Sequence, residues 1–177
     1  MRVLAQLEKS LLARGHREFR IVLIGQGAEE KWLRENMRHA EFSGWLTGNA
    51  LSRAYADMDA FVFPSETDTF GLAVLEALAS GVPAVVTPRG GPASTIEHGK
   101  SGHVAKSVDE FSSILTGLMT QPELLASMRI EARQRALSIG SWGQIFSGMY
   151  HAYERYTRPE AEMKSHLLEE SRKTVNT

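Results

Sequence analysis

Short apolar runs alternate with helical segments along this chain, and the alternation restricts its fold more than any other feature. The runs Ile21–Ile24, Ala60–Phe63 and Ala84–Val86 carry no charge and each stops close to a glycine or proline. Such runs are typical of strands buried on both faces of a sheet. Helical segments between them favour parallel strands joined by crossovers. The sequence therefore predicts an α/β fold with a Rossmann-like, doubly wound parallel sheet.

The remaining elements follow from the same periodicity. We expect a short strand near Phe42 and helices over Val3–Ala13, Ala28–Met37, Leu51–Asp57 and Phe70–Ser80. Gly81 suits the left-handed cap that ends many helices. Residues 1–156 are expected to form one domain, and the polar segment 157–177 is expected to be a tail or a docking helix.

Composition excludes several classes of function. The chain has 20 basic and 21 acidic residues and a net charge of -1, which argues against nucleic acid as a partner. It has no cysteine, so it has no disulfide and no cysteine-ligated metal, and its six histidines lack metal-type spacing. The first residues do not resemble a signal peptide, and we find no convincing bilayer span, so a cytoplasmic protein is expected.

An acidic loop between a strand and a helix is the most informative stretch. The whole stretch is Pro64–Ala77, in which the short acidic loop leads into a helix that opens near Phe70 and Gly71. In a doubly wound sheet, ligands bind beyond the carboxyl ends of the strands. We expect the free amides of Phe70, Gly71 and Leu72 to suit phosphate oxygens there, with Gly71 allowing close approach to the backbone.

Glu76 is the only charged residue between Phe70 and Val86. The helix that carries it is therefore expected to be buried nearly all round, and a carboxylate in such surroundings needs hydrogen-bond partners. Two neighbouring sugar hydroxyls would serve. A backbone cap or an arginine of the fold would serve equally well, and the residues alone do not decide between them.

This stretch resembles the signature of the family-4 retaining glycosyltransferases, in which two acidic residues are separated by seven others. Here the pair is Asp68 and Glu76. The resemblance implies the C-terminal, donor-binding half of the GT-B architecture. It casts Glu76 as the ligand of the ribose hydroxyls and Asp68 as the catalytic-site acid that positions the donor sugar. Thr69, Phe70, Gly71 and Leu72 would face the sugar and its diphosphate.

The resemblance extends from about Phe19 to Tyr156. Gly25 and Gly27 are similar to the family's Gly-x-Gly turn, and Trp45 follows a segment whose backbone meets the base. The implied donor is a UDP-, GDP- or ADP-sugar, with no cofactor and no metal. The implied partner is an acceptor-binding N-terminal GT-B domain absent from this chain, and peripheral membrane association of the complete enzyme is compatible with this assignment.

Three departures from the family pattern stand out. The arginine and lysine that usually neutralise the diphosphate cannot be assigned here, and the acceptor domain is missing. Ala93, Ser94 and Thr95 stand where the family often has a glutamate. Moreover, Met1–Gly15 is predicted to be helical with no strand before it, so the sheet would lack its first, central strand. We therefore expect the isolated chain to be marginally stable or self-associating and to transfer no sugar alone.

Two alternatives compete with this assignment. Gly25-Gln26-Gly27 could begin a dinucleotide fingerprint, but Glu30 replaces its third glycine. The stronger rival is a non-catalytic nucleotide-binding or interaction domain, either a truncated remnant or one half of a split enzyme.

Overall fold

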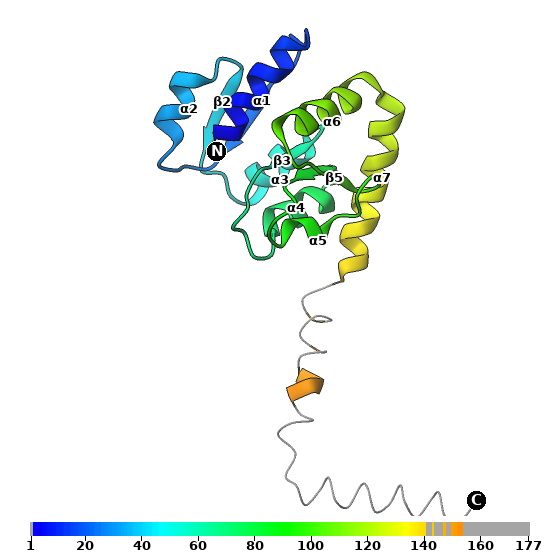
Figure 1. Cartoon of the computed structure of the whole chain (residues 1–177). Coiled ribbons are helices and arrows are strands. Elements are labelled where there is room, and N and C mark those ends of the chain that lie inside the picture. Colours follow the sequence, from blue (N-terminus) through cyan, green and yellow to red (C-terminus); the bar gives the residue numbers. More distant parts are fainter. Residues whose placement is uncertain (1, 141–142, 144–146, 148–149, 154–177) are drawn as a thin grey trace, which may run out of the picture. The chain divides into compact units, whose positions relative to one another are not determined.

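The computed structural model describes residues 2–140, 143, 147 and 150–153 (Figure 1). The chain divides into two compact units, residues 1–138 and 139–177. The predicted boundary at residue 156 and the predicted tail 157–177 lie outside the described residues. No helix in the described part of the chain has the length and apolar character needed to cross a membrane.

Helices and strands alternate as expected. In chain order they are α1 (Arg2–Ala13), β1 (Ile21–Ile24), α2 (Glu30–Asn36), β2 (Ala40–Gly44), α3 (Gly48–Ala56), β3 (Phe61–Phe63), α4 (Leu72–Ala79), β4 (Ala84–Val86), α5 (Pro92–Thr95), β5 (Gly102–Val104), α6 (Val108–Thr120) and α7 (Pro122–Ile139).

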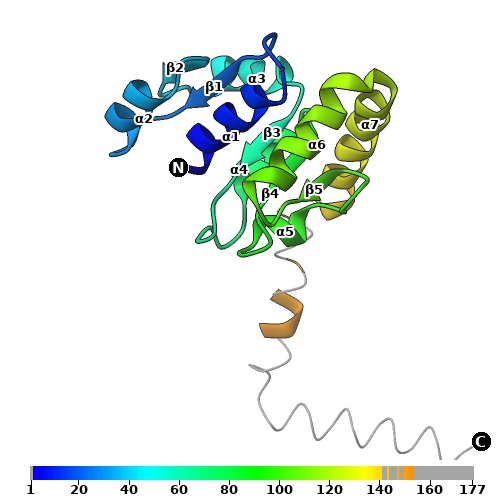
Figure 2. The ribbon, with the colours of Figure 1, turned by 45° about the horizontal axis from the view of Figure 1, so that its top comes forward.

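The strands form two parallel sheets (Figure 2). β1 pairs with β2, with Ile21 opposite Ala40, while β3, β4 and β5 pair in that order. In a doubly wound sheet the first strand lies at the centre and joins the two halves. Among the described residues, no strand pairs with both β1 and β3 to join the two sheets. The sheet is therefore split at the position of the central strand that the sequence predicts to be missing.

Helix α1 connects the two halves through the main core. One cluster of buried side chains joins α1 to α2 and α6, and its members include Leu7, Leu33 and Phe111. Figure 2 shows α1 running alongside α6. The buried face of α1 includes Leu4, Leu7 and Leu11. This packing holds the two sheets in one unit although no backbone hydrogen bonds of the described strands join them.

The buried face of α1 also carries a carboxylate that we did not predict. Glu8 is only 2% exposed. Its Oε1 accepts hydrogen bonds from the backbone amides of Arg38 (3.0 Å) and His39 (2.5 Å), in the segment between α2 and β2. These donors offset the cost of burying the charge. Glu8 thereby fixes the entry to β2 from a neighbouring helix.

The prediction that Ile21–Ile24 is buried on both faces is wrong. Val22 is 39% exposed, and the other residues of β1 are only partly buried. The apolar run does form a strand, but β2 is its only partner among the described strands. Ala84–Val86 matches the prediction, because β4 lies between two strands and has no exposed surface.

Helix α4 is shorter than predicted at both ends. It starts at Leu72 because Gly71 has a φ of +81°, which helical geometry does not allow. It ends at Ala79, and Gly81 takes the expected left-handed conformation with a φ of +71°. The short strand predicted near Phe42 is confirmed as β2, which has five residues.

Candidate functional site

The acidic loop follows β3 and leads into α4, as predicted, but its amides are used differently. Oδ1 of Asp68 accepts hydrogen bonds from the amide of Phe70 (3.0 Å) and from that of Gly71. The expectation that these two amides are free for phosphate is therefore wrong. An aspartate two or three residues upstream readily bonds such amides, and its charge is favourable at the N-terminus of a helix.

Gly71 serves a tight turn and close packing, not an open approach to the backbone. It is buried, and a Cβ there would lie 3.0 Å from Cα of Pro92. Pro92 thus fills the space that a side chain at position 71 would need. The positive φ of Gly71 gives a second reason for glycine at this position.

The loop after β4 holds the acidic loop in place. The amide of Gly91 donates to the carbonyl of Asp68 (2.9 Å), and the Thr95 hydroxyl donates to the carbonyl of Phe70 (3.2 Å). A Cβ on Gly91 would lie 2.1 Å from the carbonyl oxygen of Thr69. This role of Gly91 was not found from the sequence, because a close backbone approach leaves no signal except the glycine itself.

The side of α4 next to the acidic loop faces solvent. Thr69, Phe70 and Leu72 are exposed, Leu72 by 51%. Glu76, one turn beyond Leu72, is also exposed. The expectation of a helix buried nearly all round is wrong. The apolar residues of α4 form a buried core face, but Leu72 lies on a second face that is exposed to solvent.

Glu76 has a specific partner that sequence reasoning did not find. The Tyr55 hydroxyl, from the last turn of α3, donates to Oε2 of Glu76 at 3.0 Å. Tyr55 is 6% exposed. Burial raises the pKa of the Tyr55 phenol well above its usual range, and the hydrogen bond to Glu76 and its negative charge raise this pKa further. Tyr55 therefore remains a neutral donor at physiological pH.

A second group of predicted residues lies at the carboxyl ends of β1 and β2. Gly25, with a φ of +109°, donates its amide to the carbonyl of Gly44 at 2.8 Å. Gly27 has no atom within 4 Å of an added Cβ. Trp45 is 73% exposed. The structure therefore brings the predicted site residues together in two groups, one at each sheet.

Two hollows in the described surface lie away from both groups. One, of about 430 Å³, runs along a single face of α2 between Glu30 and Glu35. The other, of about 190 Å³, is lined by polar residues that include Glu97 and Arg135. The first has walls from one helix only, and neither contains a residue predicted for the site.

Comparison with known families decides the assignment. Residues 2–135 match the family described as Glycosyl transferases group 1. The chain belongs to this family.

Two curated glycosyltransferases are similar to this group 1 chain. A GDP-mannose-dependent alpha-mannosyltransferase of Corynebacterium glutamicum is 42% identical over 54% of the chain and 23% of the relative. One from Mycolicibacterium smegmatis is 35% identical over 77% of the chain and 36% of the relative. The chain thus spans between about a quarter and just over a third of the length of these relatives.

The fold is that of the GT-B glycosyltransferases. The crystal structure of Anabaena HepE in complex with UDP and glucose superposes with a TM-score of 0.70 at 18% identity, over 84% of this chain and 44% of HepE. At that identity the likeness concerns the fold alone. It agrees with the predicted α/β architecture and with parallel strands in both sheets.

Proposed function

We propose that this chain is the donor-binding half of a retaining, metal-independent glycosyltransferase. It binds a nucleotide-diphosphate sugar, from which the complete enzyme transfers a hexose to an acceptor. One observation carries the proposal: Glu76 is an exposed carboxylate with one oxygen held by a buried donor, beside a loop that presents a second acid, Asp68.

Glu76 has the chemistry to bind a ribose. Its carboxylate accepts a hydrogen bond from the Tyr55 hydroxyl at Oε2. A carboxylate can accept about four hydrogen bonds, so Oε1 and the second lone pair of Oε2 can accept the hydroxyls of a diol. Hydrogen bonds to a charged acceptor are stronger than neutral ones. The Glu76 carboxylate is therefore suited to bind the two adjacent hydroxyls of a ribose.

Asp68 positions the donor sugar in this proposal. Its Oδ1 is occupied by the amides of Phe70 and Gly71, which fixes the carboxylate and leaves Oδ2 for a sugar hydroxyl. No covalent intermediate on Asp68 is needed, since the acceptor hydroxyl attacks from the face that the diphosphate leaves. Because Asp68 already occupies the Phe70 and Gly71 amides at the N-terminus of α4, the diphosphate is stabilised in this proposal by cationic side chains of the complete enzyme.

The donor and the partner follow from the relatives. Both curated relatives above are named GDP-mannose-dependent, so GDP-mannose is the first donor to test, ahead of UDP- and ADP-hexoses. Because the chain spans so little of them, we propose that the acceptor site lies on an N-terminal GT-B domain outside this sequence. Cytoplasmic location, with peripheral membrane association of the complete enzyme, belongs to the same proposal.

Glu76→Gln tests the proposal most directly. Loss of the charge should weaken binding of GDP by about 1–3 kcal/mol, the scale of a hydrogen bond to a charged group. The near-isosteric amide should leave the unfolding transition unchanged. Calorimetric titration of residues 1–177 with GDP, UDP and ADP measures the effect.

Glu18→Gln is the matched control, because Glu18 is exposed and lies outside both groups of site residues. Equal affinity of Glu76→Gln and the wild type would exclude the ribose contact. If the wild type binds none of the three nucleotides, the donor-binding function itself is wrong.

A further inference from the structure

Tyr55 is a buried side chain with one polar atom aimed at the candidate site. Its ring packs edge-on against Phe61 of β3, with centroids 5.7 Å apart. It belongs to a small core cluster with Ala77 and Val82. Because the ring is enclosed on these sides, its hydroxyl has one fixed direction, toward Oε2 of Glu76.

Glu76 by contrast would be free to rotate without this contact. It lies on the exposed face of α4, and a glutamate there samples several rotamers, whose loss opposes ligand binding. A rigid donor selects the rotamers that keep Oε2 beside Tyr55. The remaining acceptor positions of the carboxylate are then held ready before a ligand arrives.

We propose that Tyr55 is a positioning residue for Glu76 and sets the preference of this site for ribonucleotides over deoxyribonucleotides. The inference rests on the proposed function, because it requires Glu76 to bind the ribose diol. Tyr55 itself does not contact the ligand. The hydroxyl acts through the orientation of the carboxylate, which must accept two hydrogen bonds from adjacent hydroxyls at once.

The chemistry of the pair supports this role over one confined to packing. Tyr55 keeps its proton at physiological pH, since burial and the carboxylate both raise the pKa of its phenol. It can therefore only donate to Glu76. If the hydrogen bond only gave the buried Tyr55 hydroxyl a partner, it would contribute to stability and not to the choice between ligands.

The test is Tyr55→Phe, which removes the hydroxyl and keeps the ring. Calorimetric titration of residues 1–177 compares GDP with 2′-deoxy-GDP, and UDP with 2′-deoxy-UDP if the wild type prefers uridine. We expect the wild type to favour the ribonucleotide by about tenfold, the scale of a charge-assisted hydrogen bond. In Tyr55→Phe this ratio should fall by about threefold or more, with little change in affinity for the deoxynucleotide.

Tyr150→Phe, at an exposed tyrosine, is the control and should keep the wild-type ratio. If Tyr55→Phe does not fold, Tyr55→Met also removes the hydroxyl and fills irregular space flexibly, and it serves the same test.

Three outcomes would overturn the inference. Equal losses for both nucleotides in Tyr55→Phe would assign the hydroxyl to packing alone. If Glu76→Gln loses the preference for the ribonucleotide but Tyr55→Phe keeps it, Tyr55 has no positioning role, and the proposed function still holds. A wild type that binds no nucleotide would overturn both.

Discussion

The two sheets of this chain differ in how completely they are enclosed. The strand β4 has partners on both sides and no exposed surface, whereas β1 has a partner on one side and exposes Val22. Both strands are short, apolar and parallel to their neighbours. The difference shows that the amino-acid sequence of a strand specifies its conformation, while its burial depends on what pairs beside it.

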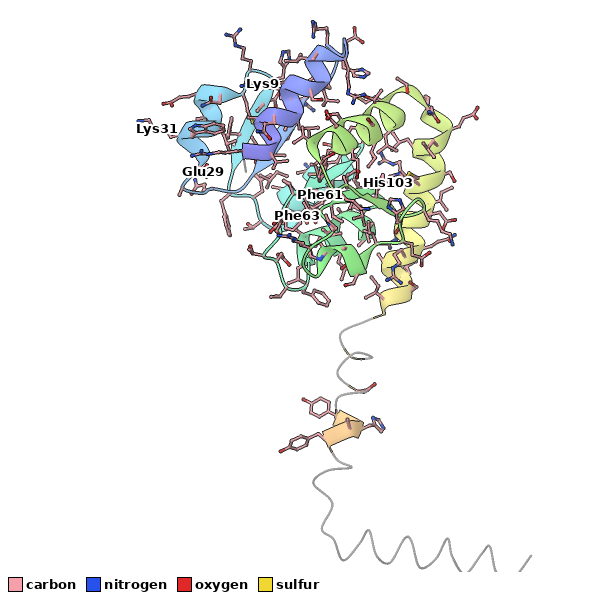
Figure 3. The ribbon with its side chains drawn as sticks, viewed as in Figure 1. Lys9, Glu29, Lys31, Phe61, Phe63 and His103 are labelled. Carbon is pink, nitrogen blue, oxygen red and sulfur yellow. The ribbon has the colours of Figure 1, made fainter. Side chains whose placement is uncertain are left out.

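The same contrast extends to the connections around each sheet. Three arginines of α7 donate to carbonyls of the segments around β3 and β4: Arg129 to Met58 (3.1 Å), Arg135 to Thr95 (2.9 Å), and Arg133 to Ala79. These bonds satisfy carbonyls at helix ends that would otherwise lack partners. We call the half that contains β3, β4 and β5 the enclosed half. Figure 3 shows Phe61, Phe63 and His103 in this half, and Lys9, Glu29 and Lys31 in the half that contains β1 and β2.

The largest expected effect compares the same substitution in the two sheets. Val85→Ala removes two methyl groups from fully enclosed space and should lower the free energy of unfolding by about 2–3 kcal/mol. Val22→Ala removes them from a half-open surface and should cost about 0.5–1 kcal/mol. Urea unfolding of both variants measures the difference, and the loss of strand propensity is the same in each.

Equal losses at the two valines would break the comparison. They would mean that β1 is covered in solution, and sedimentation velocity would then show whether a second copy of the chain covers it. If the losses are equal and the chain is monomeric, another segment of the same chain must cover Val22.

A second pair of substitutions tests how tightly each candidate group of site residues is packed. Gly91→Ala brings a Cβ against the backbone of Thr69, so it should destabilise the chain by about 1–3 kcal/mol and displace the acidic loop. Gly27→Ala meets no atom and needs no positive φ, so it should be neutral or stabilising by about 0.4–1 kcal/mol. Thermal unfolding distinguishes the two. A tolerated Gly91→Ala would show that the acidic loop moves aside without cost.

The fold was predictable from the sequence because periodicity and turn chemistry are local. The strand Ala84–Val86, the helix over Val3–Ala13 and the left-handed cap at Gly81 all follow from neighbouring residues. The break between β1 and β3 was predictable as well, since it depends on the order of strands in this fold class. The exposure of Val22 is not predictable in this way, because the composition of β1 does not show which elements lie beside it.

The candidate site was predictable only in outline. The positions of Asp68 and Glu76 follow from their place after β3, but their partners come from distant segments. Tyr55 is 21 residues from Glu76 in sequence, and nothing in its local pattern marks the hydrogen bond. Likewise, the occupation of the Phe70 and Gly71 amides depends on one rotamer of Asp68. Sequence patterns locate such groups without showing what they bond.

The smallest expected effect concerns pH and the enclosed half alone. Burial lowers the pKa of the His103 imidazole below its usual value of 6.5, and nearby His98 lowers it further. The unfolded chain therefore takes up a proton first as the pH falls, so His103 removes stability below about pH 6.5 and has no such effect above it. His103→Gln should lose less stability than the wild type between about pH 8 and about pH 5.

His151→Gln, at an exposed histidine, is the control. Urea unfolding at each pH measures the difference, in which the carboxylates common to both chains cancel. Identical pH profiles for His103→Gln and the wild type would mean that β5 opens to water, and the enclosed half would then end at β4.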